Sequence, residues 1–224
     1  LNQFIKGITN KSKDKQVIVS HEPFMSHKIV KQPDGKPISK SEEENHNIFK
    51  LTYDQIKKYD SGTTYFENFP HQVKIITHKP SLEDVIKKTS EIDSSILYNI
   101  EIKRRKKWDN IHHPSYTEFA DLVIDKLTAL NVLGRTTVQC FDIETLQYIH
   151  NKYPDVKLVY LVLNINNIIK NLDLLGFKPY VYSPHFLMIN HTVVSYCKQN
   201  SIKLIPWTVN DYKDLEDQIK LGVD

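Results

Sequence analysis

The sequence is poor in glycine and cysteine and has no long apolar stretch. It contains 6 glycines against 10 prolines in 224 residues, which argues against a chain built around flexible linkers. Its 2 cysteines, Cys140 and Cys197, lack the spacing of a metal or redox motif, so we expect no disulfide framework. No stretch approaches the roughly 18 apolar residues of a membrane-spanning helix, so we expect no transmembrane segment. The first residues do not resemble a signal peptide, but a removed signal would leave no trace. The location therefore stays open between cytoplasm, periplasm and exterior.

The chain also lacks a strong excess of either charge. It has 30 basic and 27 acidic residues, a balance that does not indicate a nucleic-acid partner. Its 40% hydrophobic and 25% charged residues are typical of a soluble globular protein. A chain of this length can bury one large core, so we expect a single domain over residues 1–224. The sequence does not indicate the oligomeric state.

From residue 98 onward, strand and helix patterns alternate with short connections. We expect strands at 98–103, 136–141, 157–163, 180–182 and 204–209, and helices at 116–130, 144–152, 165–175, 191–200 and 211–221. This alternation predicts parallel strands in βα units, either in an open doubly wound sheet or in a (β/α)8 barrel. No glycine-rich phosphate loop follows any of these strands, which argues against the nucleotide-binding sheets and favours the barrel.

The part before residue 98 is less regular. Apolar residues at helical spacing predict the end of an amphipathic helix at Leu1–Ile8. A short apolar strand follows at Val17–Val19, and its exit carries His21. Residues 23–80 are polar and irregular, and they are longer than a structureless loop usually is, so we expect a cap or insertion subdomain there. Thr52 and Ser81 have the pattern of helix N-caps.

The strand Tyr98–Lys103 alternates strictly between apolar and polar residues. Glu101 and Lys103 lie two residues apart and therefore on one face of the strand. An acid and a base at a strand end can hold a cation and an anion side by side. They can equally form an ion pair on an exposed strand, and the pattern alone does not separate the two interpretations.

Four motifs occur together in the order and approximate spacing of a known family. They are VIVSHE at 17–22, YNIEIK at 98–103, VQCF at 138–141 and IPWTVN at 205–210. In these motifs the chain resembles the glycerophosphodiester phosphodiesterases over nearly its whole length. The resemblance implies an α/β fold, the (β/α)8 TIM barrel, and metal-dependent hydrolysis of a small-molecule glycerophosphodiester to glycerol 3-phosphate and an alcohol.

The resemblance also implies roles for individual residues. His21 resembles one of two catalytic histidines, and imidazole suits acid–base work near neutral pH. Glu101 resembles a ligand of a divalent metal, Mg²⁺ or Ca²⁺, and Lys103 resembles a phosphate-binding group. Gln139 and Trp207 resemble pocket-lining residues. Tyr182, at a strand exit, could shape the pocket for the alcohol. Trp207 and Gln139 could instead be ordinary residues of the hydrophobic core.

Two family motifs are missing. The family begins with a strand that ends in His-Arg-Gly, and a Glu-x-Asp pair, two more metal ligands, precedes the His21 hairpin; neither is present. We therefore expect the first, second and last barrel strands to be absent from this sequence, and we expect the protein to contain residues beyond it. A mass well above 26.2 kDa would support that expectation.

The missing motifs leave one alternative from another functional class. A catalytically inactive barrel would bind phosphodiesters or a protein partner without turnover. Within the enzyme class, a phospholipase-type barrel would act on larger lipids, but the polar 23–80 region does not favour it. We expect Arg104–Lys107 to be a solvated loop and His112–His113 to lie on the surface.

Overall fold

The computed structural model describes residues 4–67 and 69–224. They fall into two compact units, divided after Arg135, and each unit is described by itself. Residues 1–3 of the predicted first helix and Asn68 of the predicted cap lie outside the described residues. Within the described ranges, no helix is long and apolar enough to cross a membrane.

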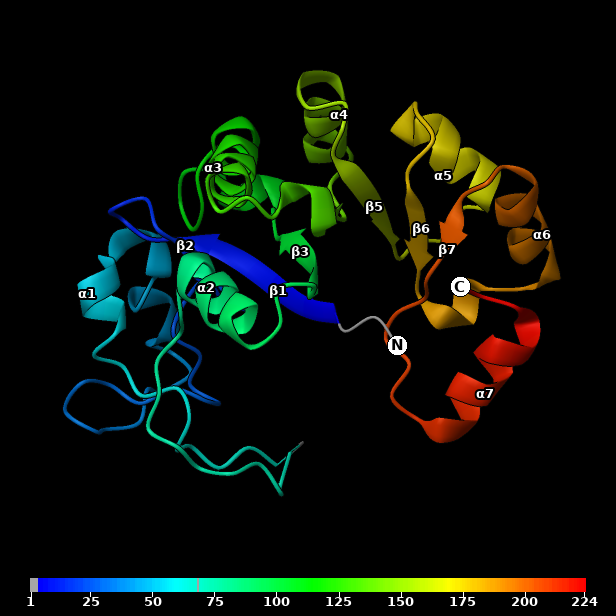
Figure 1. Ribbon diagram of the computed structural model, residues 1–224. Coiled ribbons are helices and arrows are strands. Elements are labelled where there is room, and N and C mark those ends of the chain that lie inside the picture. The colour runs from blue at the N-terminus through cyan, green and yellow to red at the C-terminus, as the bar shows by residue number, and fades with distance from the viewer. Residues whose placement is uncertain (1–3, 68) are drawn as a thin grey trace. The chain divides into compact units, whose positions relative to one another are not determined.

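Unit 1 is built on three strands, β1 (Phe4–Lys11), β2 (Val17–Val19) and β3 (Leu97–Ile102), in the order β2-β1-β3 (Figure 1). β1 pairs antiparallel with β2, where Thr9 faces Val19, and parallel with β3, where Ile8 faces Glu101. The prediction of a helix at Leu1–Ile8 was therefore wrong for the described residues. A strand also stands before the His21 hairpin, where we expected a strand to be absent.

Pairing on both edges explains why β1 is a strand despite its helical spacing of apolar residues. Strand pairing supplies backbone hydrogen bonds that a sequence pattern does not show. Gly7 permits the close approach of β3, because a Cβ at this position would lie 3.1 Å from Ile100 Cδ1. β1 thus fixes the spacing between β2 and β3. The absence of the first and last barrel strands stays a prediction.

The long excursion after β2 has a core of its own. Seven buried residues form one cluster: Ile18, Met25, Val30, Ile38, Ile48, Ile56 and Tyr59. Ile18 belongs to β2, so the cluster fastens the excursion to the strand. The excursion contains three short helices: η1 (Glu43–Asn45), η2 (Ile48–Lys50) and α1 (Tyr53–Ile56). Thr52 forms the predicted cap of α1, and it accepts a hydrogen bond from the backbone N–H of Gln55.

The helices of unit 1 follow the excursion and β3. They are α2 (Leu82–Ile92), η3 (Lys106–Trp108), α3 (Tyr116–Ala129) and η4 (Leu133–Arg135). Ser81 caps α2 as predicted, by accepting a hydrogen bond from the backbone N–H of Asp84. An ion pair of 2.6 Å between Lys126 and Glu83 joins α3 to α2. Phe119 and Val123 are fully buried on the inner side of α3.

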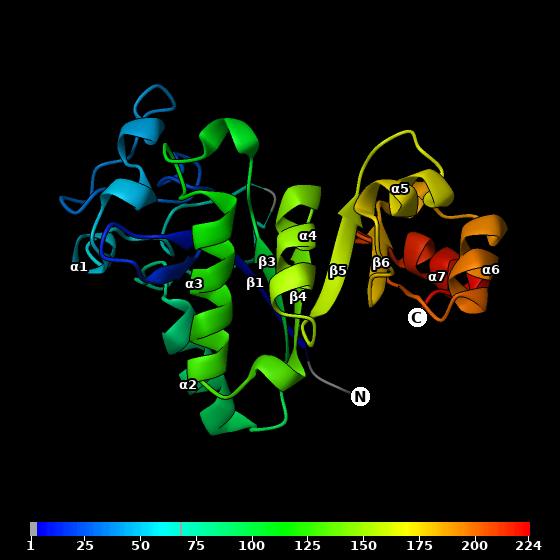
Figure 2. The ribbon, with the colours of Figure 1, turned by 90° about the horizontal axis from the view of Figure 1, so that it is seen from above.

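Unit 2 repeats βα units with parallel strands in chain order (Figure 2). Its strands are β4 (Thr136–Cys140), β5 (Lys157–Val162), β6 (Val181–Pro184) and β7 (Lys203–Leu204). Its helices are α4 (Ile143–Lys152), α5 (Ile168–Leu175), η5 (Phe186–Met188), α6 (His191–Gln199) and α7 (Tyr212–Leu221). The predicted alternation is confirmed, although β7 ends earlier than expected: after Leu204 only one isolated bridge, between Trp207 and His185, continues the pairing.

Candidate active site

Three side chains meet at the exit of β2 in unit 1. The ammonium of Lys103 lies 2.5 Å from His21 Nε2, and His21 Nδ1 lies 2.5 Å from a carboxylate oxygen of Glu22. Because an ammonium can only donate, His21 Nε2 accepts, and Nδ1 carries the proton that is donated to Glu22. The arrangement therefore favours a neutral His21 with its Nε2 lone pair directed at Lys103.

The strand order brings these residues together. His21 follows β2, Lys103 follows β3, and β1 lies between the two strands. The buried Asn10 of β1 holds the turn after β2, because its side-chain amide donates to the carbonyls of Ser20 (2.7 Å) and Glu22 (3.3 Å). The Ser20 hydroxyl also donates to the Glu22 carbonyl, at 2.7 Å. Asn10 is thus a positioning residue that the sequence analysis did not identify.

Glu22 stays ionised because of its neighbours. The hydrogen bond from His21 is the largest influence and lowers the pKa of the Glu22 carboxyl. Partial burial raises that pKa, but the positive charges of Lys103 and Lys79 lower it further. A carboxylate at this position keeps the proton on Nδ1 of His21, and it would stabilise an imidazolium formed during a reaction.

Glu101 is buried on β3 and was predicted to bind a metal. Thr9 of β1 donates a hydrogen bond of 2.8 Å to the Glu101 backbone carbonyl, which ties the two strands together at this point. A divalent cation needs several oxygen ligands. The residues of β1 in register with Asn99 and Glu101 are Lys6 and Ile8, and β1 contains no carboxylate. Among the residues that the structure describes, no group of three or more His, Cys, Asp or Glu side chains could hold a metal ion. These residues alone therefore do not fit the predicted metal centre.

The other three predicted residues belong to unit 2. Gln139 is buried on β4. Tyr182 is buried on β6, where its hydroxyl accepts a hydrogen bond of 3.0 Å from Asn171, and burial raises its pKa to about 12. Trp207 donates from Nε1 to the carbonyl of Ser183 at 2.9 Å, and its ring meets Phe141 edge-on with centroids 5.1 Å apart. Tyr182 also lines a pocket of about 440 Å³ beside the loops that follow β5 and β6.

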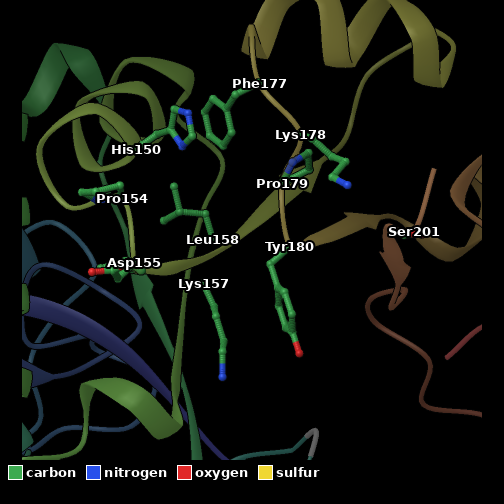
Figure 3. Close-up of a pocket in the computed structure, with 11 residues that line it drawn as sticks. His150, Pro154, Asp155, Lys157, Leu158, Phe177, Lys178, Pro179, Tyr180 and Ser201 are labelled. Carbon is green, nitrogen blue, oxygen red and sulfur yellow. The ribbon is translucent and has the colours of Figure 1, made fainter.

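Another pocket in unit 2 lies at the opposite strand ends (Figure 3). It has a volume of about 360 Å³, and Lys157 and Tyr180 line it where β5 and β6 begin. The rings of His150 and Phe177 stack directly on each other in its lining, with centroids 3.9 Å apart. Active sites of βα barrels lie at the carboxyl ends of the strands, so this pocket is not the candidate site.

The structure differs from the sequence analysis after Lys103. Arg104 is buried, and its guanidinium pairs with Asp109 at 2.6 Å, so the prediction of a solvated loop was wrong for this residue. His112 and His113 are also buried, which contradicts the predicted surface position. His113 accepts a hydrogen bond of 3.0 Å from the backbone N–H of Arg105. These contacts hold the chain that follows Lys103.

Comparisons with known proteins agree with the resemblance of the motifs. The profile of the glycerophosphoryl diester phosphodiesterase family matches residues 10–224. The chain is 28% identical over 174 residues to a glycerophosphodiester phosphodiesterase of Caldanaerobacter subterraneus subsp. tengcongensis, a match that covers 78% of this chain and 65% of the relative. The chain thus spans slightly less than two thirds of that relative's length.

Solved structures show the same fold at low sequence identity. One is described as a glycerophosphoryl diester phosphodiesterase from Silicibacter pomeroyi; it matches with a TM-score of 0.85 at 19% identity, over 98% of this chain and 77% of that one. A phosphodiesterase from Oleispira antarctica, solved with the product sn-glycerol-3-phosphate, matches with a TM-score of 0.73 at 17% identity, over 99% and 79%. The fold is of the TIM-barrel type, and the chain belongs to the glycerophosphoryl diester phosphodiesterase family.

Proposed function

We propose that the protein hydrolyses glycerophosphodiesters to glycerol 3-phosphate and an alcohol. The observation that carries the proposal is the contact chain from Lys103 through His21 to Glu22 at the strand exit. It combines a cation for the phosphodiester with a neutral imidazole whose tautomer is held by a carboxylate. The Oleispira antarctica structure, with its bound sn-glycerol-3-phosphate, supports the same substrate class.

In this proposal His21 Nε2 carries out the proton transfer. When the phosphodiester binds, the Lys103 ammonium moves from Nε2 to a non-bridging oxygen, and the lone pair of Nε2 becomes available. His21 then takes the proton of the attacking hydroxyl, either water or the glycerol 2-hydroxyl, as the new phosphorus–oxygen bond forms and the bond to the leaving alcohol breaks. Attack by the 2-hydroxyl gives a cyclic phosphate, and water then opens its bond to that oxygen to give glycerol 3-phosphate. Glu22 stabilises the positive imidazole. The imidazolium can return its proton to a leaving oxygen, in the exchange of roles that the family resemblance implies for two histidines.

The residues of unit 2 and the excursion have supporting roles in this proposal. Gln139, Trp207 and Tyr182 stay predicted substrate-binding residues, and residues 23–80 stay the predicted cap that selects the alcohol. The buried cluster that fastens this segment to β2 supports a defined subdomain at this position. The alcohol itself is not specified by these contacts.

The family in general depends on a divalent metal, and Mg²⁺ or Ca²⁺ stays our prediction for this protein. Glu101 is the ligand candidate on β3, and a metal there would need ligands in addition to the described ones. A bound divalent cation would polarise the phosphodiester and offset negative charge. None of the steps assigned to His21, Glu22 and Lys103 depends on its geometry.

The experiment that tests the function uses the full-length protein with glycerophosphocholine and glycerophosphoethanolamine, with and without a chelator. We expect release of glycerol 3-phosphate that the chelator abolishes and Mg²⁺ or Ca²⁺ restores. Release that is unaffected by the chelator would contradict the metal but not the reaction. No turnover with either substrate and either metal would favour the inactive, phosphodiester-binding barrel.

Lys103→Met should lower kcat/KM by about ten- to a hundredfold, since a hydrogen bond to a charged group contributes about 1.5–3 kcal/mol. Steady-state hydrolysis of glycerophosphocholine measures the effect. Lys107→Met is the matched control, because it removes the same charge from an exposed side chain four residues further on. Equal effects of the two substitutions would remove Lys103 from the phosphate-binding role.

A further inference from the structure

Lys79 is a buried lysine beside the candidate site, and the proposed function gives it no role. Only 7% of the residue is exposed. Its backbone runs along β2, because the N–H of Val19 donates to the carbonyl of Pro80 at 2.9 Å and Ser81 bridges Ile18. Lys79 is therefore fixed next to the strand whose exit carries His21.

The Lys79 ammonium has no hydrogen bond or ion pair with any residue that the structure describes. This differs from Lys11, which is similarly buried but pairs with Glu118 at 3.2 Å. The ammonium is not among the fully enclosed polar atoms that lack a partner, so it is not sealed off completely from solvent. A desolvated cation without a partner is costly, and a protein retains one where a bound anion completes the site.

The charges around Lys79 identify the missing partner. The one charged group that acts on it is Glu22, whose attraction opposes the burial that lowers the pKa of Lys79 to about 8. Glu22 is in turn influenced by His21, Lys103 and Lys79. The ammonium groups of Lys79 and Lys103 thus both act on the Glu22 carboxylate. Two ammonium groups near one carboxylate suit an anionic ligand such as a phosphodiester.

We propose that Lys79 is a second phosphodiester-binding cation, which acts together with Lys103 beside the His21–Glu22 pair. The inference rests on the proposed function for its substrate, but the anion site itself can be measured without turnover. A purely structural Lys79 would serve only as a counter-ion that positions Glu22. That alternative predicts a lower kcat with unchanged anion affinity, whereas a binding role predicts a weaker anion affinity.

The test is calorimetric titration of inorganic phosphate and sn-glycerol 3-phosphate into the full-length protein and its Lys79→Met and Lys79→Arg variants. We expect Lys79→Met to weaken the binding of both anions at least tenfold and Lys79→Arg to retain part of the affinity. Lys88→Met is the matched control, since Lys88 is exposed on α2 of the same unit, and it should bind like the wild type. In hydrolysis, Lys79→Met should raise KM with little change in kcat.

Each outcome decides the inference separately from the proposed function. Affinity of Lys79→Met within twofold of the wild type, or a wild type that binds neither anion, overturns the second cation. A wild type without turnover whose anion binding is lost in Lys79→Met removes the enzyme function but supports the anion site.

The Lys79→Met variant should fold, because the pKa of Lys79 is lower in the folded than in the unfolded chain. Its protonated form therefore destabilises the fold below about pH 8, and methionine removes that penalty. A thermal melt at pH 7 checks this.

Discussion

Replacing His21 by alanine is expected to lower kcat for glycerophosphodiester hydrolysis by about 10²–10⁴-fold, the usual contribution of a positioned acid–base group. The alanine variant loses His21 Nε2, the atom that contacts Lys103 and that we propose accepts the proton. KM should change much less than kcat, because Lys103 still supplies the charge that holds the phosphodiester. The His21 side chain is 62% exposed, so its removal should cost the fold little.

The measurement is steady-state hydrolysis of glycerophosphocholine by the full-length protein, with release of glycerol 3-phosphate as the readout. His191→Ala is the matched control, since His191 is an exposed histidine at the start of α6, outside the cap and the candidate site, and it should behave like the wild type. A loss of less than tenfold for His21→Ala would remove His21 from proton transfer. Circular dichroism of both variants separates a catalytic defect from a folding defect.

The regular part of the fold could be predicted because its signals are local. The caps at Thr52 and Ser81 depend on side chains within three residues of the helix start, and both formed as expected. The alternation after residue 98 was correct for the same reason, since each strand and helix has its own periodicity. β1 was missed because its partners lie elsewhere in the chain: β2 and β3 pair with both of its edges.

The sequence predicted candidate residues for the site but not the contacts between them. His21 and Lys103 were chosen from motifs at strand exits, and the strand order explains why they touch although 82 residues separate them. Glu22 stood in the same motif as His21, but nothing in the sequence showed that its carboxylate would turn back to the imidazole. Lys79 gave no signal, because a lysine next to a proline in a polar segment looks exposed until the fold buries it.

Asp109→Ala is expected to lower the free energy of unfolding by about 3 kcal/mol, at the lower end of the range for breaking a buried ion pair. Arg104 has a side chain that is 1% exposed, and Asp109 engages it through two bonds, Nε to Oδ1 at 3.1 Å and Nη2 to Oδ2 at 2.6 Å. The guanidinium also stacks 4.8 Å from the ring centre of Tyr116. Removal of Asp109 leaves this buried cation with less compensation, while the partial exposure of Asp109 moderates the cost.

Urea unfolding of the full-length protein measures the change, with Asp125→Ala as the control for an exposed aspartate of the same unit. The double variant Arg104→Met/Asp109→Ala should recover most of the lost stability, because it removes the buried charge together with its partner. A loss below about 1 kcal/mol in Asp109→Ala would place the pair among ordinary surface ion pairs.

The Arg104–Asp109 pair also fixes the residue directly after Lys103, so Asp109→Ala should lower kcat/KM as the phosphate-binding ammonium loses its position. The double variant should restore stability without restoring that activity, because methionine cannot form the fork that holds the end of β3.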